Sequence, residues 1–121
     1  MLGDPRADEK LFPGLATLPG AADEARRVAA LYPESLLMTG ERATREALVN
    51  ALGHHPIVHL ATHALVDEAT PSRSALALAA RVPGDGTGAL FADEISGMAL
   101  PGTRTVVLAS CGGTADPLAA P

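Results

Sequence analysis

The chain has very few aromatic residues, a single cysteine and no long apolar run. Aromatic residues make up 2% of the 121 residues and tryptophan is absent, so a core must be built from Ala, Val, Leu and Ile. One cysteine cannot form a disulfide within the chain, so the fold does not depend on an oxidising compartment. No apolar stretch approaches the roughly 20 residues of a membrane span, and the first residues lack the features of a signal peptide. These absences predict a cytoplasmic protein with no membrane partner.

Charge and hydrophobic content narrow the class of protein further. The net charge of −5 disfavours nucleic acid as the main partner, because phosphate binding needs a basic surface. Hydrophobic residues reach 47% against 19% charged residues, which favours a folded globule over a disordered chain. At this length we expect one domain over 1–121, with enough residues to bury a core.

Apolar patterning predicts alternating strands and helices. Residues 1–20 are rich in glycine and proline and are expected to be loop, with 1–17 as a lead-in to the domain. The pattern then predicts strands at 35–38, 57–61 and 105–110, helices at 21–31, 45–52 and 92–97, and a hairpin of 74–80 with 89–91. This order is typical of an α/β fold with a mostly parallel sheet and helices on both faces.

Two reactive residue types follow two of the predicted strands. His63 comes two residues after strand 57–61, and Cys111 follows strand 105–110, 48 residues after His63. The carboxyl ends of parallel strands meet at one edge of a sheet, so thiol and imidazole are expected to lie together there. An imidazole that takes the thiol proton activates the sulfur as a nucleophile. The pair therefore predicts a catalytic His63–Cys111 dyad.

Neighbouring residues complete the predicted site. The backbone N–H groups of Ala64 and Cys111 can form an oxyanion hole, and Gly112 and Gly113 let a substrate backbone approach closely. Asp67, four residues past His63, can orient the imidazole or attract a cationic substrate side chain.

Two other motifs are weaker. The histidines at 54, 55, 59 and 63 suggest a metal site only if their segment is helical; its β-branched residues favour a strand that buries His59, and no metal is expected. The glycine-rich segment 84–88 precedes a strand-like run and no lysine follows it, so a hairpin turn is expected, not a phosphate loop. A flavodoxin-like or nucleotide-binding domain is accordingly disfavoured.

Four stretches together carry a family resemblance. The segments 18–25 (LPGAADEA), 43–48 (ATREAL), 58–63 (VHLATH) and 107–111 (VLASC) resemble the CHAT domain, a family of caspase-like cysteine peptidase modules often attached to tetratricopeptide repeats. The resemblance runs over nearly the whole chain. It implies a caspase-like fold, His63 as general base and Cys111 as nucleophile of a peptide-bond hydrolase acting on peptide or protein substrates. It implies no cofactor, and it suggests regulatory or repeat regions in a longer parent protein.

The resemblance also shows departures from the family pattern. Ala64 stands where the family usually has glycine, and its Cβ narrows the approach to the oxyanion hole. Residues 2–5 resemble only the tail of the family's first strand, and ten residues follow Cys111 where the family continues with a helix and strands. The sequence thus predicts a fold incomplete at both ends. A catalytically inactive fragment or interaction module that keeps only the α/β core is the alternative function.

Overall fold

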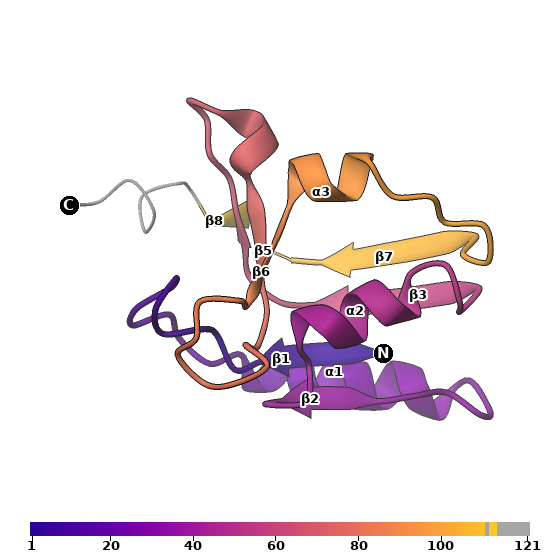
Figure 1. Cartoon of the computed structure of the whole chain (residues 1–121). Helices are drawn as coiled ribbons and strands as arrows, with labels where there is room; N and C mark the ends of the chain where they lie inside the picture. The colour runs from indigo at the N-terminus through magenta and orange to yellow at the C-terminus, as the bar shows by residue number, and fades with distance from the viewer. Residues whose placement is uncertain (111, 114–121) are drawn as a thin grey trace.

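Two four-stranded sheets meet end to end in the computed structural model, which describes residues 1–110 and 112–113 (Figure 1). The main sheet has the strand order β2-β1-β3-β7, and all its strands are parallel. Its strands are β1 (Leu2–Pro5), β2 (Met38–Gly40), β3 (Ile57–Ala61) and β7 (Thr105–Ala109). The mostly parallel α/β architecture predicted from the sequence is confirmed.

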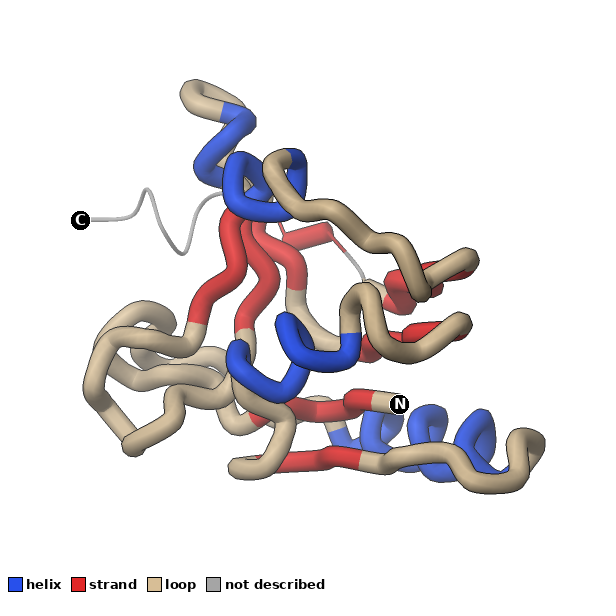
Figure 2. The backbone as a smooth tube through the Cα atoms, turned by 45° about the vertical axis from the view of Figure 1, so that its right-hand side comes forward, coloured by secondary structure: helices blue, strands red, loops and turns tan. Residues whose placement is uncertain are grey.

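The second sheet continues the chain beyond the carboxyl ends of β3 and β7. It has the order β6-β5-β4-β8, with strands β4 (Ala64–Leu65), β5 (Ala75–Ala77), β6 (Ala89–Phe91) and β8 (Gly112–Gly113). Its strands run across the direction of the main sheet (Figure 2). β5 and β6 form the predicted antiparallel hairpin, and the glycine-rich segment 84–88 lies in the turn between them.

Helices cover the main sheet on both faces, as predicted. Helix α1 (Pro19–Ala30) packs against β1 and β3 on one face, and α2 (Arg45–Ala51) lies on the other. Leu48 of α2 is buried together with Val58 and Leu60, whose side chains leave β3 on the face opposite to that of His59. Two shorter helices, η1 (Pro71–Arg73) and α3 (Ala92–Ser96), accompany the second sheet.

The ends of α2 follow the signals in its sequence. Thr44 precedes the helix, and its hydroxyl oxygen accepts a hydrogen bond from the Ala47 backbone N–H at 3.0 Å. Gly53 follows it with φ +90°, the left-handed conformation that glycine adopts most readily after a helix. The predicted start is confirmed, and the helix ends at Ala51, one residue before the predicted end.

Two strand predictions need correction. The glycine and proline content of residues 1–20 favours loop, yet Leu2–Pro5 forms a strand near the middle of the main sheet. The strand predicted over 35–38 is shifted to Met38–Gly40. In both cases pairing between β1 and β2, 36 residues apart at Leu2 and Met38, decides the structure. Such long-range pairing overrides local propensity.

β3 and β7 differ in how much of them is buried. Val58, His59, Leu60 and Ala61 of β3 are all buried, as expected for a parallel strand covered on both faces. β7 is exposed instead, with Val106, Val107 and Leu108 at 41%, 42% and 53%. Within the described residues β7 pairs only with β3 in the main sheet, so its outer edge is open.

None of the helices in the described part of the chain is long and apolar enough to cross a membrane.

Candidate active site

The candidate site lies at the carboxyl edge of the main sheet, where β3 and β7 end beside the first turn of α1. We call the hollow there the carboxyl-edge cleft; its volume is about 350 Å³. Its walls come from the segment leading into α1, from α1 itself, and from the ends of the two strands. The residues are Thr17, Leu18, Pro19, Gly20, Ala21, Glu24, Ala61, Thr62, His63 and Ala109.

His63 stands in this cleft with one ring nitrogen already bound. Its Nε2 lies 2.9 Å from the backbone carbonyl oxygen of Ala16. A carbonyl oxygen can only accept a hydrogen bond, so Nε2 must carry the proton and donate it. In the neutral imidazole, Nδ1 is then left without a proton. The geometry therefore assigns Nδ1 as the ring nitrogen that can act as a base.

The backbone on either side of the imidazole is fastened to β5. The buried hydroxyl of Thr62 donates to the carbonyl oxygen of Ala77 at 2.5 Å, and the Ala77 N–H donates to the carbonyl oxygen of His63 at 3.0 Å. Thr62 thus acts on His63 through the main chain. These two bonds fix the junction between the two sheets at His63.

The predicted nucleophile, Cys111, lies outside the described residues, whereas the backbone on both sides of it is described. In the main sheet, Ala61 of β3 pairs with Ala109 of β7. In the second sheet, Ala64 of β4 pairs with Gly112 of β8. The described residues Ala109 and Gly112 are therefore paired with residues on either side of His63.

The remaining predicted site residues occupy different places. Ala64, Gly112 and Gly113 belong to the paired strands β4 and β8, directly beyond the cleft. Asp67 lies further along the chain: its carboxylate accepts from the Thr70 N–H at 2.8 Å, and its own N–H donates to the Ser74 hydroxyl. Asp67 thus stabilises a surface turn, and the imidazole of His63 is bound by Ala16 instead.

The other histidines follow the expected strand arrangement. His59 is buried in β3, and its Nε2 lies 2.8 Å from a carboxylate oxygen of Glu24 on α1. His54 and His55 lie in the segment between α2 and β3, and Nδ1 of His54 donates to the Asn50 carbonyl oxygen. In the part of the chain that the structure describes, no three His, Cys, Asp or Glu side chains cluster in a metal-binding arrangement.

Two groups at the site were not found from the sequence. The Ala16 carbonyl is a backbone group, and nothing in the residue type marks it as a partner of His63. In the sequence, Glu24 is one more polar residue on the expected exposed face of α1. The only signal for it was its position five residues after Pro19, where α1 begins.

The structure is an α/β module with a parallel sheet between helices and a cleft that contains a histidine where a central strand ends. The chain belongs to the CHAT domain family, a family of caspase-like, peptidase-related modules, whose model matches residues 1–116. Searches among curated proteins and among solved structures gave no match.

Proposed function

We propose that this domain is a cysteine endopeptidase in which His63 activates Cys111. The observation that carries the proposal is the hydrogen bond from His63 Nε2 to the Ala16 carbonyl oxygen. It commits the proton to one ring nitrogen and leaves the other free to take a proton from a thiol. The imidazole is thereby prepared for general-base chemistry.

Two further features of the cleft support the proposal. The register pairs Ala61 with Ala109 and Ala64 with Gly112, so the described residues before and after Cys111 in the chain are paired with residues before and after His63. The first turn of α1 lines the cleft. A helix N-terminus favours nearby negative charge, which both a thiolate and a tetrahedral oxyanion carry.

The reaction follows from these groups. Nδ1 of His63 takes the thiol proton while the Cys111 sulfur attacks the carbonyl carbon of a peptide bond. The carbon–nitrogen bond then breaks, and the imidazolium returns the proton to the leaving amine. Water, deprotonated by His63, hydrolyses the thioester and releases a carboxylic acid and the free thiol. Backbone N–H groups, with those of Ala64 and Cys111 as candidates, stabilise the oxyanion.

The pH dependence of Cys111 alkylation by iodoacetamide tests this proposal. An ordinary thiol has a pKa of about 8.5, and a thiol paired with an imidazole reacts with a lower apparent pKa. We expect the lower value in the parent chain and a return toward the ordinary value in His63→Ala. Identical profiles for the two proteins would contradict the dyad.

One observation favours a second function, an interaction module without catalysis. The apolar side chains of β7 are exposed on both faces, and such a strand edge can pair with another chain. The alkylation profile separates the two functions, because an interaction module has no need of an activated thiol.

A further inference from the structure

Asp4 stands at the carboxyl end of β1 in a backbone conformation that non-glycine residues rarely adopt. Its φ is +48°, and the pairing of β1 with β2 shifts by one residue between Gly3 and Pro5, around Asp4. Left-handed backbone at a non-glycine residue persists only where surrounding structure enforces it, and it occurs most often at functional sites. Aspartate is one of the few residues that tolerate it.

The conformation directs the Asp4 side chain to the entrance of α1. Oδ1 of Asp4 accepts a hydrogen bond from the Leu18 backbone N–H at 2.6 Å. Leu18 is the N-cap residue of α1, and its own side chain makes no capping hydrogen bond. Leu18 also lines the carboxyl-edge cleft, as does His63.

The segment 16–18 connects Asp4 to the imidazole. As the N-cap residue, Leu18 also accepts hydrogen bonds from the Ala21 and Ala22 N–H groups of α1. Apart from these, two hydrogen bonds of the described residues tie this segment to the fold: Leu18 N–H to Asp4, and the Ala16 carbonyl to His63 Nε2. The two anchors are two residues apart in the chain. Loss of the first therefore leaves the segment attached through α1 alone, which loosens the Ala16 carbonyl that makes the second.

We propose that Asp4 is a positioning residue for His63: by binding the Leu18 amide, it holds the Ala16 carbonyl where it receives the Nε2 proton. Asp4 touches neither the imidazole nor a substrate. It acts by selecting the tautomer of His63 in which Nδ1 is unprotonated. The effect of Asp4 on the activation of Cys111 rests on the proposed function. The effect of Asp4 on the tautomer of His63 does not depend on Cys111.

Three substitutions separate the position of the acceptor from its charge. Asp4→Asn keeps an oxygen acceptor at the same distance along the side chain and tolerates the left-handed backbone, while removing the charge. Asp4→Glu keeps the charge but moves the acceptor by one methylene. Asp4→Gly keeps the backbone conformation accessible but removes the acceptor. Asp23→Asn, on the exposed side of α1, is the control that removes a carboxylate from elsewhere near the helix start.

The first readout is the tautomer of His63, measured from the ¹⁵N chemical shifts of its two ring nitrogens. We expect a protonated Nε2 in the parent chain, Asp4→Asn and Asp23→Asn, and a mixture of tautomers in Asp4→Gly and Asp4→Glu. The same spectra report folding, so that if Asp4→Gly does not fold, Asp4→Glu carries the test. An unchanged tautomer in the folded variants that lack the acceptor or displace it would overturn the assignment of Asp4.

The second readout is the alkylation profile of Cys111. We expect Asp4→Gly to react up to about tenfold more slowly at neutral pH, as one unit of thiol pKa implies, and Asp4→Asn to restore the parent rate. If the parent thiol itself behaves as an ordinary thiol, the proposed peptidase activity fails while the tautomer still decides the role of Asp4. If the parent thiol is activated and Asp4→Gly leaves its profile unchanged, the positioning role fails and the dyad stands.

Discussion

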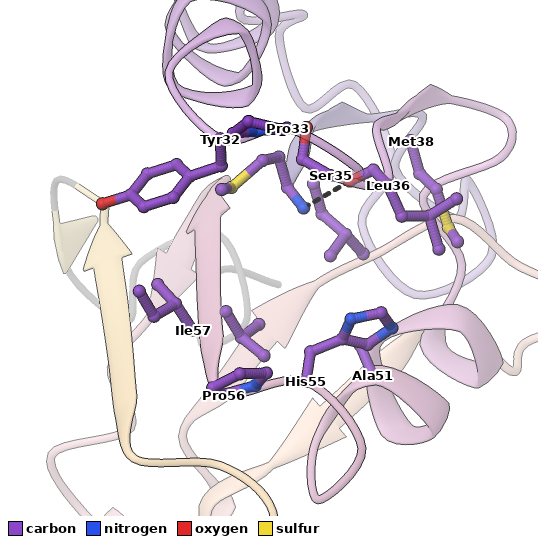
Figure 3. A pocket seen from close by; sticks show the side chains of 12 residues that line it. Tyr32, Pro33, Ser35, Leu36, Met38, Ala51, His55, Pro56 and Ile57 are labelled. Atoms are coloured by element: carbon purple, nitrogen blue, oxygen red, sulfur yellow. Dashed lines mark hydrogen bonds between the residues drawn. The ribbon is translucent and has the colours of Figure 1, made fainter.

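The two ends of the main sheet each carry a cavity, and the cavities differ in chemistry. At the amino end, a pocket of about 180 Å³ is bordered largely by apolar side chains from the starts of β1, β2 and β3, the segment that follows α1, and the end of α2 (Figure 3). We call it the amino-edge pocket. Tyr32, Leu36, Pro56 and Ile57 are among the side chains that surround it. At the carboxyl end, the larger cleft contains His63 and Glu24.

The difference shows that the shape of a cavity and its chemistry are separate properties. The amino-edge pocket also contains a histidine, His55, and a hydrogen bond from the Met1 amino group to the Leu36 carbonyl oxygen, but among the described residues no hydrogen bond binds the His55 ring. In the carboxyl-edge cleft the imidazole of His63 is bound to Ala16, and its main chain is fastened to β5. In a parallel α/β sheet, reactive groups converge at the carboxyl ends of the strands because the loops that carry them meet there.

The largest expected effect separates the two histidines directly. His63→Ala should slow the hydrolysis of an activated ester such as p-nitrophenyl acetate by about 10²- to 10⁴-fold, the usual contribution of a general base. His55→Ala, at the opposite end of the sheet, should leave the rate unchanged. The release of p-nitrophenolate measures both. Equal losses in the two variants would mean that the carboxyl edge has no special role.

A second prediction concerns the contact that places α1 beside the cleft. A Cβ added to Gly3 would lie 2.6 Å from both the Ala21 carbonyl oxygen and the Ala25 Cβ, so Gly3→Ala must push the helix away from β1. We expect a loss of about 1–3 kcal/mol in the free energy of unfolding, the usual range for overpacking. Urea denaturation measures it.

The matched control for Gly3→Ala is the glycine at the start of α1. No heavy atom lies within 4 Å of a Cβ added to Gly20, and its φ is not positive. Gly20→Ala should therefore leave stability unchanged or raise it by up to about 1 kcal/mol. If Gly3→Ala were as well tolerated as Gly20→Ala, α1 would not be held against β1 by close packing.

A third prediction uses one substitution on the two faces of the sheet. Ala51 of α2 lines the amino-edge pocket, so Ala51→Leu adds apolar atoms to existing space and should raise the free energy of unfolding by about 0.5–2 kcal/mol. Ala25 of α1 is fully buried against β1, so Ala25→Leu should lower it. Opposite signs in urea denaturation are the expected result. A loss of stability in both variants would show that the amino-edge pocket cannot accept a side chain.

Sequence patterns predicted the parts of this fold that depend on neighbouring residues. Thr44 marks the start of α2 through its side-chain hydrogen bond, and Gly53 marks the end through its backbone freedom. β3 is apolar at successive positions because both its faces are covered. Local composition missed β1 because its few residues include a glycine and a proline, whereas the family resemblance matches residues 2–5 to the tail of a strand. Only its pairing with distant strands makes it extended.

The candidate site was predictable in part for the same reason. The topology brings His63 to the carboxyl edge, as the order of strands implied. The groups that orient its imidazole were not predictable, because the Ala16 carbonyl and the left-handed backbone of Asp4 carry no signal in residue type. The role of Cys111, which lies outside the described residues, stays a prediction.

The smallest expected effect lies away from both cavities, in the turn between β5 and β6. A hydrogen bond from the Thr87 hydroxyl holds the pKa of the exposed Asp85 carboxyl below its usual range, and the N–H groups of Thr87 and Val82 and the charge of Arg81 act in the same direction. The folded state therefore favours the carboxylate. Its stabilising contribution is present above the ordinary pKa of an aspartate and is lost as the pH falls through the lowered value.

Asp85→Asn tests this contribution. The substitution should slightly reduce the dependence of unfolding on pH across the acidic range between the two pKa values, and it should change neither the His63 tautomer nor the alkylation of Cys111. Denaturation at a series of acidic pH values measures the first effect, and an NMR titration of the Asp85 carboxyl carbon in the parent chain measures its pKa directly. A titration at or above the ordinary value would mean that Thr87 does not bind the carboxylate in solution. A change at His63 would mean that the turn and the carboxyl-edge cleft are coupled. The comparison of the two sheet ends assumes that such sites are independent, and it would then fail.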